Sequence, residues 1–380
     1  MSKRHILLSF IFISPLSASA VPVFNITDLG TLGGNYSYAE GVNNSGQVVG
    51  YSGTGDGKQR AFITNSQGQM VEAGPLNNLV HSRAYAVNDS GVIAGYAYNS
   101  YDNYALIGES GNFSSVSGLE NTPSIATGIN NSGQTTGYFV DGFNARAYIS
   151  DATNGFVDLG HLGGGESTGR DINEDGTVTG YSWMANGDVH AFVYDTQNLM
   201  QDLGTLGGKY AYSYAINDSG KIAGFSRIAS NNDIQHAFVG DALGGLMDLG
   251  TLGGDHSSAL GINNDGIVVG ASSTQSGEFH AMYWDPMEGM FDLNEMVLDL
   301  VGWQYLHVST GISDTGYITG WGVVDSGERH AFLLSKASVN IPEPPSYVLF
   351  LFGIVGMCRT AFKRTKQKTK YSRLSKQIQF

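Results

Sequence analysis

The chain has 380 residues, of which 53 are glycine, 20 are tyrosine and only 8 are proline. Its formal charge is −14, and residues 21–341 hold 10 basic against 33 acidic residues. So acidic a region argues against nucleic acid or anionic lipid as the main partner, since both require clustered basic side chains. A single cysteine, Cys358, excludes an intramolecular disulfide.

The N-terminus has the three parts of a secretory signal peptide. Lys3 and Arg4 are basic, residues 6–15 are apolar, and Ala18 and Ala20 form a small-residue cleavage site. The apolar stretch is too short for an ordinary membrane span. We therefore expect signal peptidase to remove residues 1–20, leaving Val21 as the first residue of the exported protein.

A repeat fills most of the remaining sequence. Each copy has a polar Asn/Asp/Ser cluster closed by glycine and followed by β-branched residues, which favours a tight turn between two short strands. The turn glycines recur every 42 to 50 residues, at Gly46, Gly91, Gly133, Gly176, Gly220, Gly266 and Gly316. Seven copies at a period near 44 indicate a repeat protein.

Four strand-like segments are visible in a copy, and the third has a recurring core in which alanine usually follows Arg or His and precedes an aromatic residue, which we call the Arg/His-Ala-aromatic core. That segment begins at Arg60, Tyr104, Arg146, His190, His236, His280 and His330. The pattern resembles the HAF repeats of bacterial extracellular proteins, and the resemblance covers nearly all of residues 21–335. It implies an exported repeat protein but no particular reaction.

Four strands in about 44 residues is the size of one β-propeller blade. The last copy ends at Ser335 without a fourth strand, whereas residues 24–30 supply an unmatched one at the other end of the chain. We therefore predict an all-β, seven-bladed β-propeller over residues 21–336, its last blade completed by the N-terminal strand. The alternative is a β-solenoid.

The C-terminus has a linker, residues 337–346, that contains Pro342-Glu343-Pro344. An apolar segment of residues 347–358 follows, and a basic tail begins at Arg359 and runs to residue 380. A short apolar segment before a basic cluster predicts a transmembrane helix with a cytoplasmic tail. These residues resemble the PEP-CTERM sorting signal of Gram-negative, exopolysaccharide-producing bacteria. The resemblance implies transient anchoring in the inner membrane, processing by an exosortase, and delivery to the cell surface or medium. The alternative is a plain single-pass membrane anchor.

The histidines of the third segments are not expected to bind one metal ion together, because equivalent positions of the repeat would lie far apart in a ring. Asp171, Asn173 and Asp175 have the spacing of the first half of a calcium loop, but the closing acidic ligand is missing at Ser182. Calcium at this loop is thus the one cofactor candidate, and no other cofactor is expected. Aromatic residues that differ between the copies are candidates for stacking on sugars or for packing between blades: Tyr98, Tyr101, Trp183, Tyr210 and Tyr212.

No catalytic constellation is visible: the sequence has no Gly-x-Ser-x-Gly elbow and no phosphate-binding loop. The prediction is a non-enzymatic binding or scaffold module at the cell surface or in the biofilm matrix, with polysaccharide or other surface proteins as partners. The alternative is a propeller enzyme, a hydrolase or lyase acting on extracellular polysaccharide. Charged residues converging on the central channel would favour the enzyme.

Overall fold

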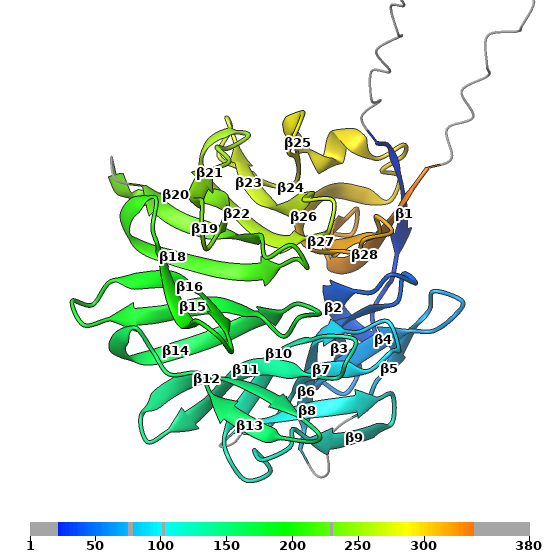
Figure 1. The fold of residues 1–380 in the computed structure, drawn as a ribbon. Coiled ribbons are helices and arrows are strands. Elements are labelled where there is room, and N and C mark those ends of the chain that lie inside the picture. Colours follow the sequence, from blue (N-terminus) through cyan, green and yellow to red (C-terminus); the bar gives the residue numbers. More distant parts are fainter. Residues whose placement is uncertain (1–21, 75–78, 101–102, 229–230, 338–380) are drawn as a thin grey trace, which may run out of the picture. The chain divides into compact units, whose positions relative to one another are not determined.

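The computed structural model describes residues 22–74, 79–100, 103–228 and 231–337. Within these ranges the chain contains 28 strands and one short 3-10 helix, so the all-β prediction is confirmed (Figure 1). No helix in the described ranges is long and apolar enough to cross a membrane. The predicted signal peptide with Val21, the sorting motif, the apolar segment and the basic tail lie outside the described residues.

Antiparallel pairings divide these described strands into seven units of four. Units one to three are β2 (Gly33–Val42), β3 (Val48–Thr54), β4 (Gln59–Thr64), β5 (Met70–Glu72); β6 (His81–Val87), β7 (Ile93–Tyr98), β8 (Asn103–Glu109), β9 (Asn112–Ser115); and β10 (Ser124–Ile129), β11 (Thr135–Asp141), β12 (Asn144–Asp151), β13 (Gly155–Asp158).

Units four to six are β14 (Gly163–Ile172), β15 (Val178–Met184), β16 (Val189–Asp195), β17 (Leu199–Gly204); β18 (Gly207–Ile216), β19 (Ile222–Ile228), β20 (Asn231–Asp241), β21 (Gly245–Asp248); and β22 (Gly253–Ile262), β23 (Val268–Thr274), β24 (Phe279–Asp285), β25 (Gly289–Asp292). Unit seven consists of β26 (Trp303–Ile312), β27 (Ile318–Val324), β28 (Arg329–Lys336) and the N-terminal strand β1 (Phe24–Asp28). The helix η1 (Leu293–Met296) follows unit six.

The recurring polar cluster forms the turn between the first two strands of a unit. In unit one, Gly46 has a φ of 80°, which glycine adopts without steric cost, and its N–H donates to the Asn43 carbonyl. The Asn43 side-chain oxygen accepts from the backbone N–H groups of Ser45 and Gln47. The side chain of the asparagine therefore replaces backbone partners within the turn.

Neighbouring units pack face to face because small residues let their backbones approach closely. The alanine of the Arg/His-Ala-aromatic core is fully buried, and in unit one the Ala61 N–H donates to the hydroxyl of Ser82 in unit two. Gly41 on β2 has no space for a Cβ, which would lie 2.8 Å from the Tyr85 carbonyl oxygen of unit two. Antiparallel four-stranded sheets packed in this way are the blades of a β-propeller, and this is the type of fold that the chain has.

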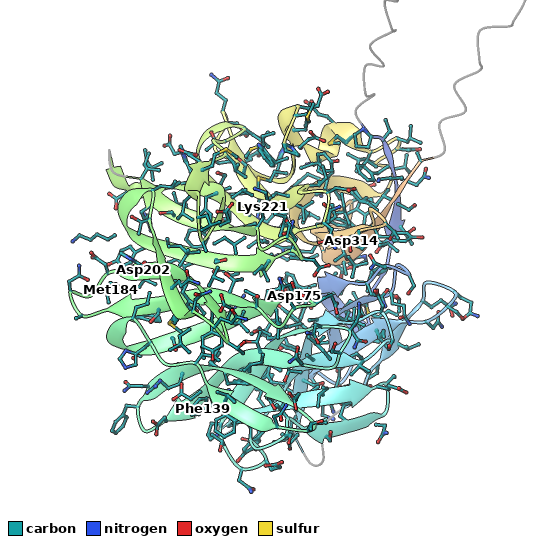
Figure 2. All side chains as sticks on the ribbon, viewed as in Figure 1. Phe139, Asp175, Met184, Asp202, Lys221 and Asp314 are labelled. Atoms are coloured by element: carbon teal, nitrogen blue, oxygen red, sulfur yellow. The ribbon has the colours of Figure 1, made fainter. Side chains whose placement is uncertain are left out.

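The core is divided into clusters that lie between neighbouring sheets, and side chains fill the space there (Figure 2). A representative cluster joins Phe192 and Tyr194 of unit four to Ala147 of unit three. A buried phenylalanine stands at the same place in several units, as Phe62, Phe192, Phe238 and Phe332. Burial of such side chains supplies the main stabilisation in a chain without disulfides.

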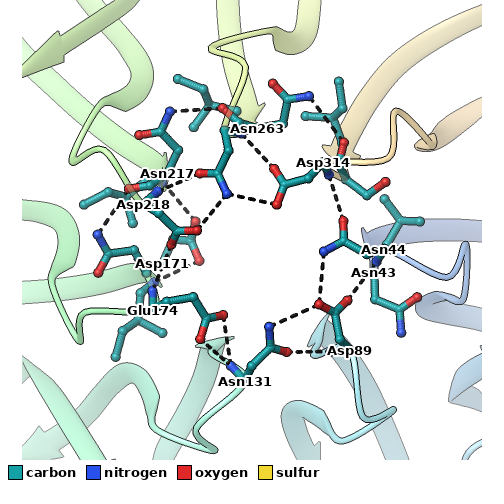
Figure 3. Close-up of a pocket in the computed structure, with 18 of the residues that line it drawn as sticks. Asn43, Asn44, Asp89, Asn131, Asp171, Glu174, Asn217, Asp218, Asn263 and Asp314 are labelled. Atoms are coloured by element: carbon teal, nitrogen blue, oxygen red, sulfur yellow. Dashed lines mark hydrogen bonds between the residues drawn. The ribbon is translucent and has the colours of Figure 1, made fainter.

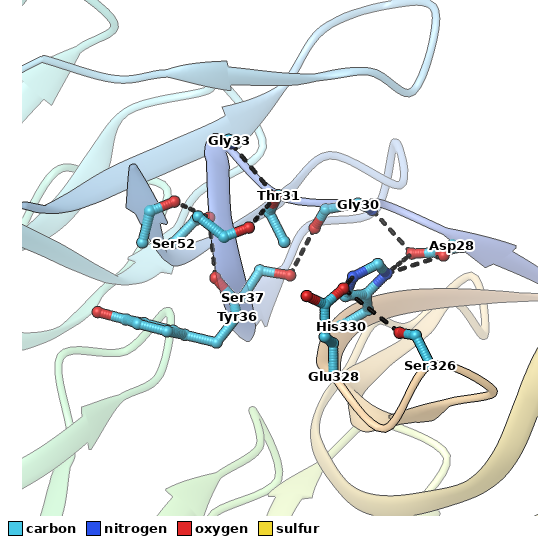
Figure 4. A network of polar contacts seen from close by, with 12 residues as sticks. Asp28, Gly30, Thr31, Gly33, Tyr36, Ser37, Ser52, Ser326, Glu328 and His330 are labelled. Atoms are coloured by element: carbon cyan, nitrogen blue, oxygen red, sulfur yellow. Dashed lines mark hydrogen bonds and ion pairs between the residues drawn. The ribbon is translucent and has the colours of Figure 1, made fainter. Parts of the chain in front are cut away.

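The N-terminal strand β1 is paired with the last strand of the repeat (Figure 1). Phe24 lies opposite Lys336 and Asp28 opposite Phe332 in an antiparallel register. The Asp28 carboxylate contacts Nδ1 of His330 at 2.9 Å (Figure 4). Phe24 is 1% exposed and belongs to the cluster that contains Phe332.

Replacing Phe24 by alanine is expected to lower the free energy of unfolding by about 3–5 kcal/mol, because a buried ring would be lost and a cavity left behind. Phe143→Ala is the matched control, since Phe143 is fully exposed and its loss should change stability by less than about 0.5 kcal/mol. Urea unfolding followed by tryptophan fluorescence measures both. An equal stability of the two variants would show that β1 is not part of the folded core.

Candidate functional site

Turn asparagines link each unit to the next. The amide of Asn43 donates to the backbone carbonyl of Asn88 in unit two, at 3.0 Å. The same bond recurs from Asn88 to Asn130, Asn130 to Asn173, Asn173 to Asn217, Asn217 to Asn263, and Asn263 to Ser313. These asparagines are at most 5% exposed, so their amides would be costly to leave unpaired.

The second residue of each turn forms a circuit of hydrogen bonds, which we call the turn belt. The backbone N–H of each member donates to the side-chain oxygen of the member in the next unit, and the circuit returns from Asp314 to Asn44 at 2.9 Å (Figure 3). In order, its members are Asn44, Asp89, Asn131, Glu174, Asp218, Asn264 and Asp314.

The turn belt surrounds an opening of about 190 Å³. Four of its members bring carboxylates to this opening: Asp89, Glu174, Asp218 and Asp314. Asparagine amides are placed between them; the Asn264 amide, for instance, donates to both Asp218 and Asp314. The opening is therefore strongly acidic, and hydrogen bonds from neighbouring amides stabilise part of its negative charge.

A deeper cavity of about 260 Å³ continues from this opening, because Asp171 and Ile262 line both. Its wall is built by one residue position of the first strand in every unit. In chain order that position holds Glu40, Tyr85, Thr127, Arg170, Tyr214, Leu260 and Thr310. We call this space the inner cavity; Glu40 and Arg170 are the two charged residues at the shared position.

Burial raises the pKa of Glu40 to about 7, and the positive charges of Arg170 and Arg83 oppose the shift only partly. Burial likewise raises the pKa of Asp171 to about 6, although its carboxylate accepts from the backbone N–H groups of Ile172 and Ile216. The inner cavity thus holds two carboxyl groups that change charge within the neutral range.

The three calcium candidates do not form a ligand set. Asp171 is engaged by two backbone N–H groups, and the Asn173 amide donates to Asn217 while its oxygen accepts from Thr177. Asp175 is exposed in the turn. Within the described ranges, no group of three or more His, Cys, Asp or Glu side chains is placed to hold a metal ion.

Four of the five candidate aromatic residues are described, and all four are partly buried; Tyr101 lies outside the described residues. Tyr212 of unit five contacts Tyr181 of unit four with 4.7 Å between ring centres, and Trp183 contacts the same Tyr181 at 5.7 Å.

The other two aromatic candidates lie apart from each other. In unit two, Tyr98 stacks on Tyr96 and donates its hydroxyl to Gln59 of unit one. Tyr210 on β18 lies opposite Val189 on β16, where the two strands pair in parallel. The structure therefore brings Trp183 and Tyr212 together, and places aromatic side chains where neighbouring units pack.

Histidines that open the third strands are each paired with an acid from the fourth strand of the same unit. Nδ1 contacts a carboxylate at 2.7 Å in His190–Asp202 and at 2.8 Å in His236–Asp248. Arg146 and Asp158 replace this pair in unit three, with 2.8 Å between charged atoms. In unit seven the acid is Asp28, which comes from the other end of the repeat. These histidines have a structural role.

Sequence reasoning missed the turn belt and the inner cavity. The sequence did contain a signal for the inner cavity. Glu40 and Arg170 occupy a position that is uncharged in the other copies, and Asp171 occupies a position at which the other copies have glycine or alanine. The spacing of these residues in the sequence does not show which of them face the inner cavity.

No protein-family model and no curated protein matches the chain. Among solved structures it is similar to TolB from Acinetobacter baumannii, with 14% identity and a TM-score of 0.46, covering 76% of this chain and 63% of that one. It is also similar to a catalytically inactive virginiamycin B lyase from Staphylococcus aureus, with 12% identity and a TM-score of 0.44, covering 83% of this chain and 100% of that one. Neither likeness carries a conclusion about ligand or activity.

The raised pKa of Glu40 predicts a pH-dependent stability. A carboxyl group with a raised folded-state pKa stabilises the fold fully below its unfolded pKa, near 4.5, and loses that contribution as the pH rises through about 7. Glu40→Gln should therefore reduce the loss of unfolding free energy between pH 4.5 and 7.5 by roughly 1–3 kcal/mol. Urea unfolding at several pH values measures it, with the exposed Glu278→Gln as control. Identical pH profiles for wild type and Glu40→Gln would contradict the assignment.

Proposed function

We propose that the described chain is a ring of seven blades closed by β1, and that it serves as an exported, non-enzymatic binding module. Its place is the cell surface or exopolysaccharide matrix of a Gram-negative bacterium. Two contacts support closure: the pairing of β1 with β28, and the hydrogen bond by which the turn belt returns from Asp314 to Asn44. A closed ring gives the last blade its fourth strand and leaves only short, protected sheet edges.

The observation that carries a binding role is the inner cavity. Asparagine at the first turn position, present in six of the seven units, and the turn belt repeat from unit to unit, as structural positions in a repeat protein do. Glu40, Arg170 and Asp171 break the repeat, and all three line one cavity. Polar groups that converge on a concave site between aromatic walls are typical of a small-molecule site.

A second candidate is an enzyme that cleaves extracellular polysaccharide. Two observations favour it: charged residues from different units, Glu40, Arg170 and Asp171, converge on the inner cavity, and the Glu40 pKa of about 7 would suit a proton donor near neutral pH. Most glycoside hydrolases, however, require a second free carboxylate on the other side of the bond. Asp171 is the other carboxylate of the inner cavity, and two backbone N–H groups already occupy it. The binding role is therefore our first choice.

The sequence resemblances supply the proposed route. HAF-type repeats joined to a PEP-CTERM signal imply export, removal of residues 1–20 by signal peptidase, and processing by an exosortase near Pro342-Glu343-Pro344. The inner membrane would be a transient partner, through residues 347–358. Polysaccharide or other surface proteins would be the lasting partners.

A glycan array tests the binding role. The full chain, purified in a zwitterionic detergent, should bind a defined subset of glycans, whereas an equally acidic unrelated protein should bind none. Incubation with the glycans that bind, followed by chromatography of the products, separates the two candidates: unchanged glycans support a binding module, and shortened chains support the enzyme. A chain that binds no glycan and cleaves none would refute both.

Sorting is tested by replacing Pro342, Glu343 and Pro344 together with alanine in the producing cell. We expect the altered chain to remain in the inner-membrane fraction at full length, while the natural chain appears outside the membrane in a shorter form. An immunoblot of the cell fractions measures this. Pro286→Ala with Glu288→Ala, in the turn between β24 and β25, is the matched control and should be sorted normally.

A further inference from the structure

We propose that the inner cavity is a binding site for one uncharged hexose unit, held between the Arg170 guanidinium and the Glu40 carboxyl group. This inference rests on the proposed binding role and specifies its ligand. It depends on three observations: two charged side chains without a hydrogen-bond or ion-pair partner, the charges along the entry path, and the size and walls of the cavity.

Arg170 is an unused donor group. Among the described residues it forms no ion pair and no hydrogen bond, and its Nε is buried without a partner. The guanidinium lies over the ring of Tyr214, with Cζ 4.6 Å from the ring centre, and this contact fixes its orientation. A buried donor of this kind is costly unless a ligand or water accepts from it.

Glu40 is the matching acceptor. It lines the same cavity, and among the described residues its side chain too has neither a hydrogen bond nor an ion pair. Arg170 and Arg83 are close enough to act on its charge, but neither lies within ion-pair distance of it. A sugar with neighbouring hydroxyl groups would satisfy both residues, since a hydroxyl accepts from a guanidinium and donates to a carboxylate.

Charge along the path selects an uncharged ligand. The opening that leads to the cavity is lined by the carboxylates of the turn belt, which repel an anion such as a uronic acid. A cation that passed the opening would meet the unpaired Arg170 beyond it. A neutral polyol encounters neither penalty and gains charge-assisted hydrogen bonds at both residues.

Size and walls restrict the ligand to a single ring. A volume of about 260 Å³ is slightly below the usual range for sites that hold drug-sized molecules. Tyr85 and Tyr214 give the cavity apolar surface for the C–H face of a sugar. The Thr127 and Thr310 hydroxyls donate to the carbonyls of Gly169 and Ala39, so their remaining lone pairs are available to accept.

Ligand-observed NMR and calorimetry on the full chain in zwitterionic detergent test the site. The probes are methyl α-D-mannoside, methyl β-D-glucoside and methyl β-D-galactoside, with glucuronate and spermidine as the charged comparisons. At least one methyl hexoside should bind, and the charged probes should not. Arg170→Gln and Glu40→Gln should each weaken that binding by about tenfold or more, as the loss of a hydrogen bond to a charged group does. Lys221→Gln and Glu278→Gln are the matched controls, because they make the same charge changes at other positions, and they should bind as the natural chain does.

The outcomes separate this inference from the proposed binding role. A positive glycan array with no binding of any methyl hexoside overturns the inner-cavity site and leaves the binding role standing. Hexoside binding that Arg170→Gln does not weaken also overturns the site, provided that the variant keeps the natural melting temperature. Tighter binding of glucuronate or spermidine than of every hexoside would show that the ligand is charged, contrary to the inference.

Discussion

Hydrogen bonds between the turns of neighbouring units are the constraint on which the rest of the fold depends. A blade is a small antiparallel sheet with polar edges, and it gains stability only by covering its faces with its neighbours. The buried amide of Asn130 reaches the carbonyl of Asn173 in the next unit, and the N–H of Asn131 reaches the carboxylate of Glu174. Each turn is therefore positioned by the turn that follows it, and the first strands beside these turns line the inner cavity.

One recurring sequence motif makes this close approach possible. The alanine of the Arg/His-Ala-aromatic core donates its N–H to a first-strand serine of the next unit, as Ala147 does to Ser167, and a larger side chain at either place would separate the sheets. The first residue of the core binds the acid on the fourth strand, as His236 binds Asp248. The motif thus combines one contact between units with one contact within a unit, which explains why it recurs as a block.

Departures from the repeat gather where a repeat protein has room for function. Unit four carries Arg170 and Asp171 at first-strand positions that hold uncharged residues in most other copies, and unit one contributes Glu40 from across the same cavity. These residues add partly buried charge that the other copies of the repeat do without. Their burial and the raised pKa of Glu40 are costs that structural positions avoid, and such costs are characteristic of functional sites.

The sequence alone determined the strand content, the length of the repeat and the turn chemistry, because these depend on local preferences: glycine at positive φ in the turn at Gly46, and β-branched residues in the strand after it. It also indicated that residues 24–28 form a strand without a partner in their own copy. Only the tertiary structure decided which side chains line the inner cavity. Glu40 and Tyr38 are two positions apart on one strand, so alternation alone would place both on the same face, yet only Glu40 of the two lines the cavity. Glu40 and Arg170 are 130 residues apart in the sequence and line one cavity only because of how the units pack, which no local pattern encodes.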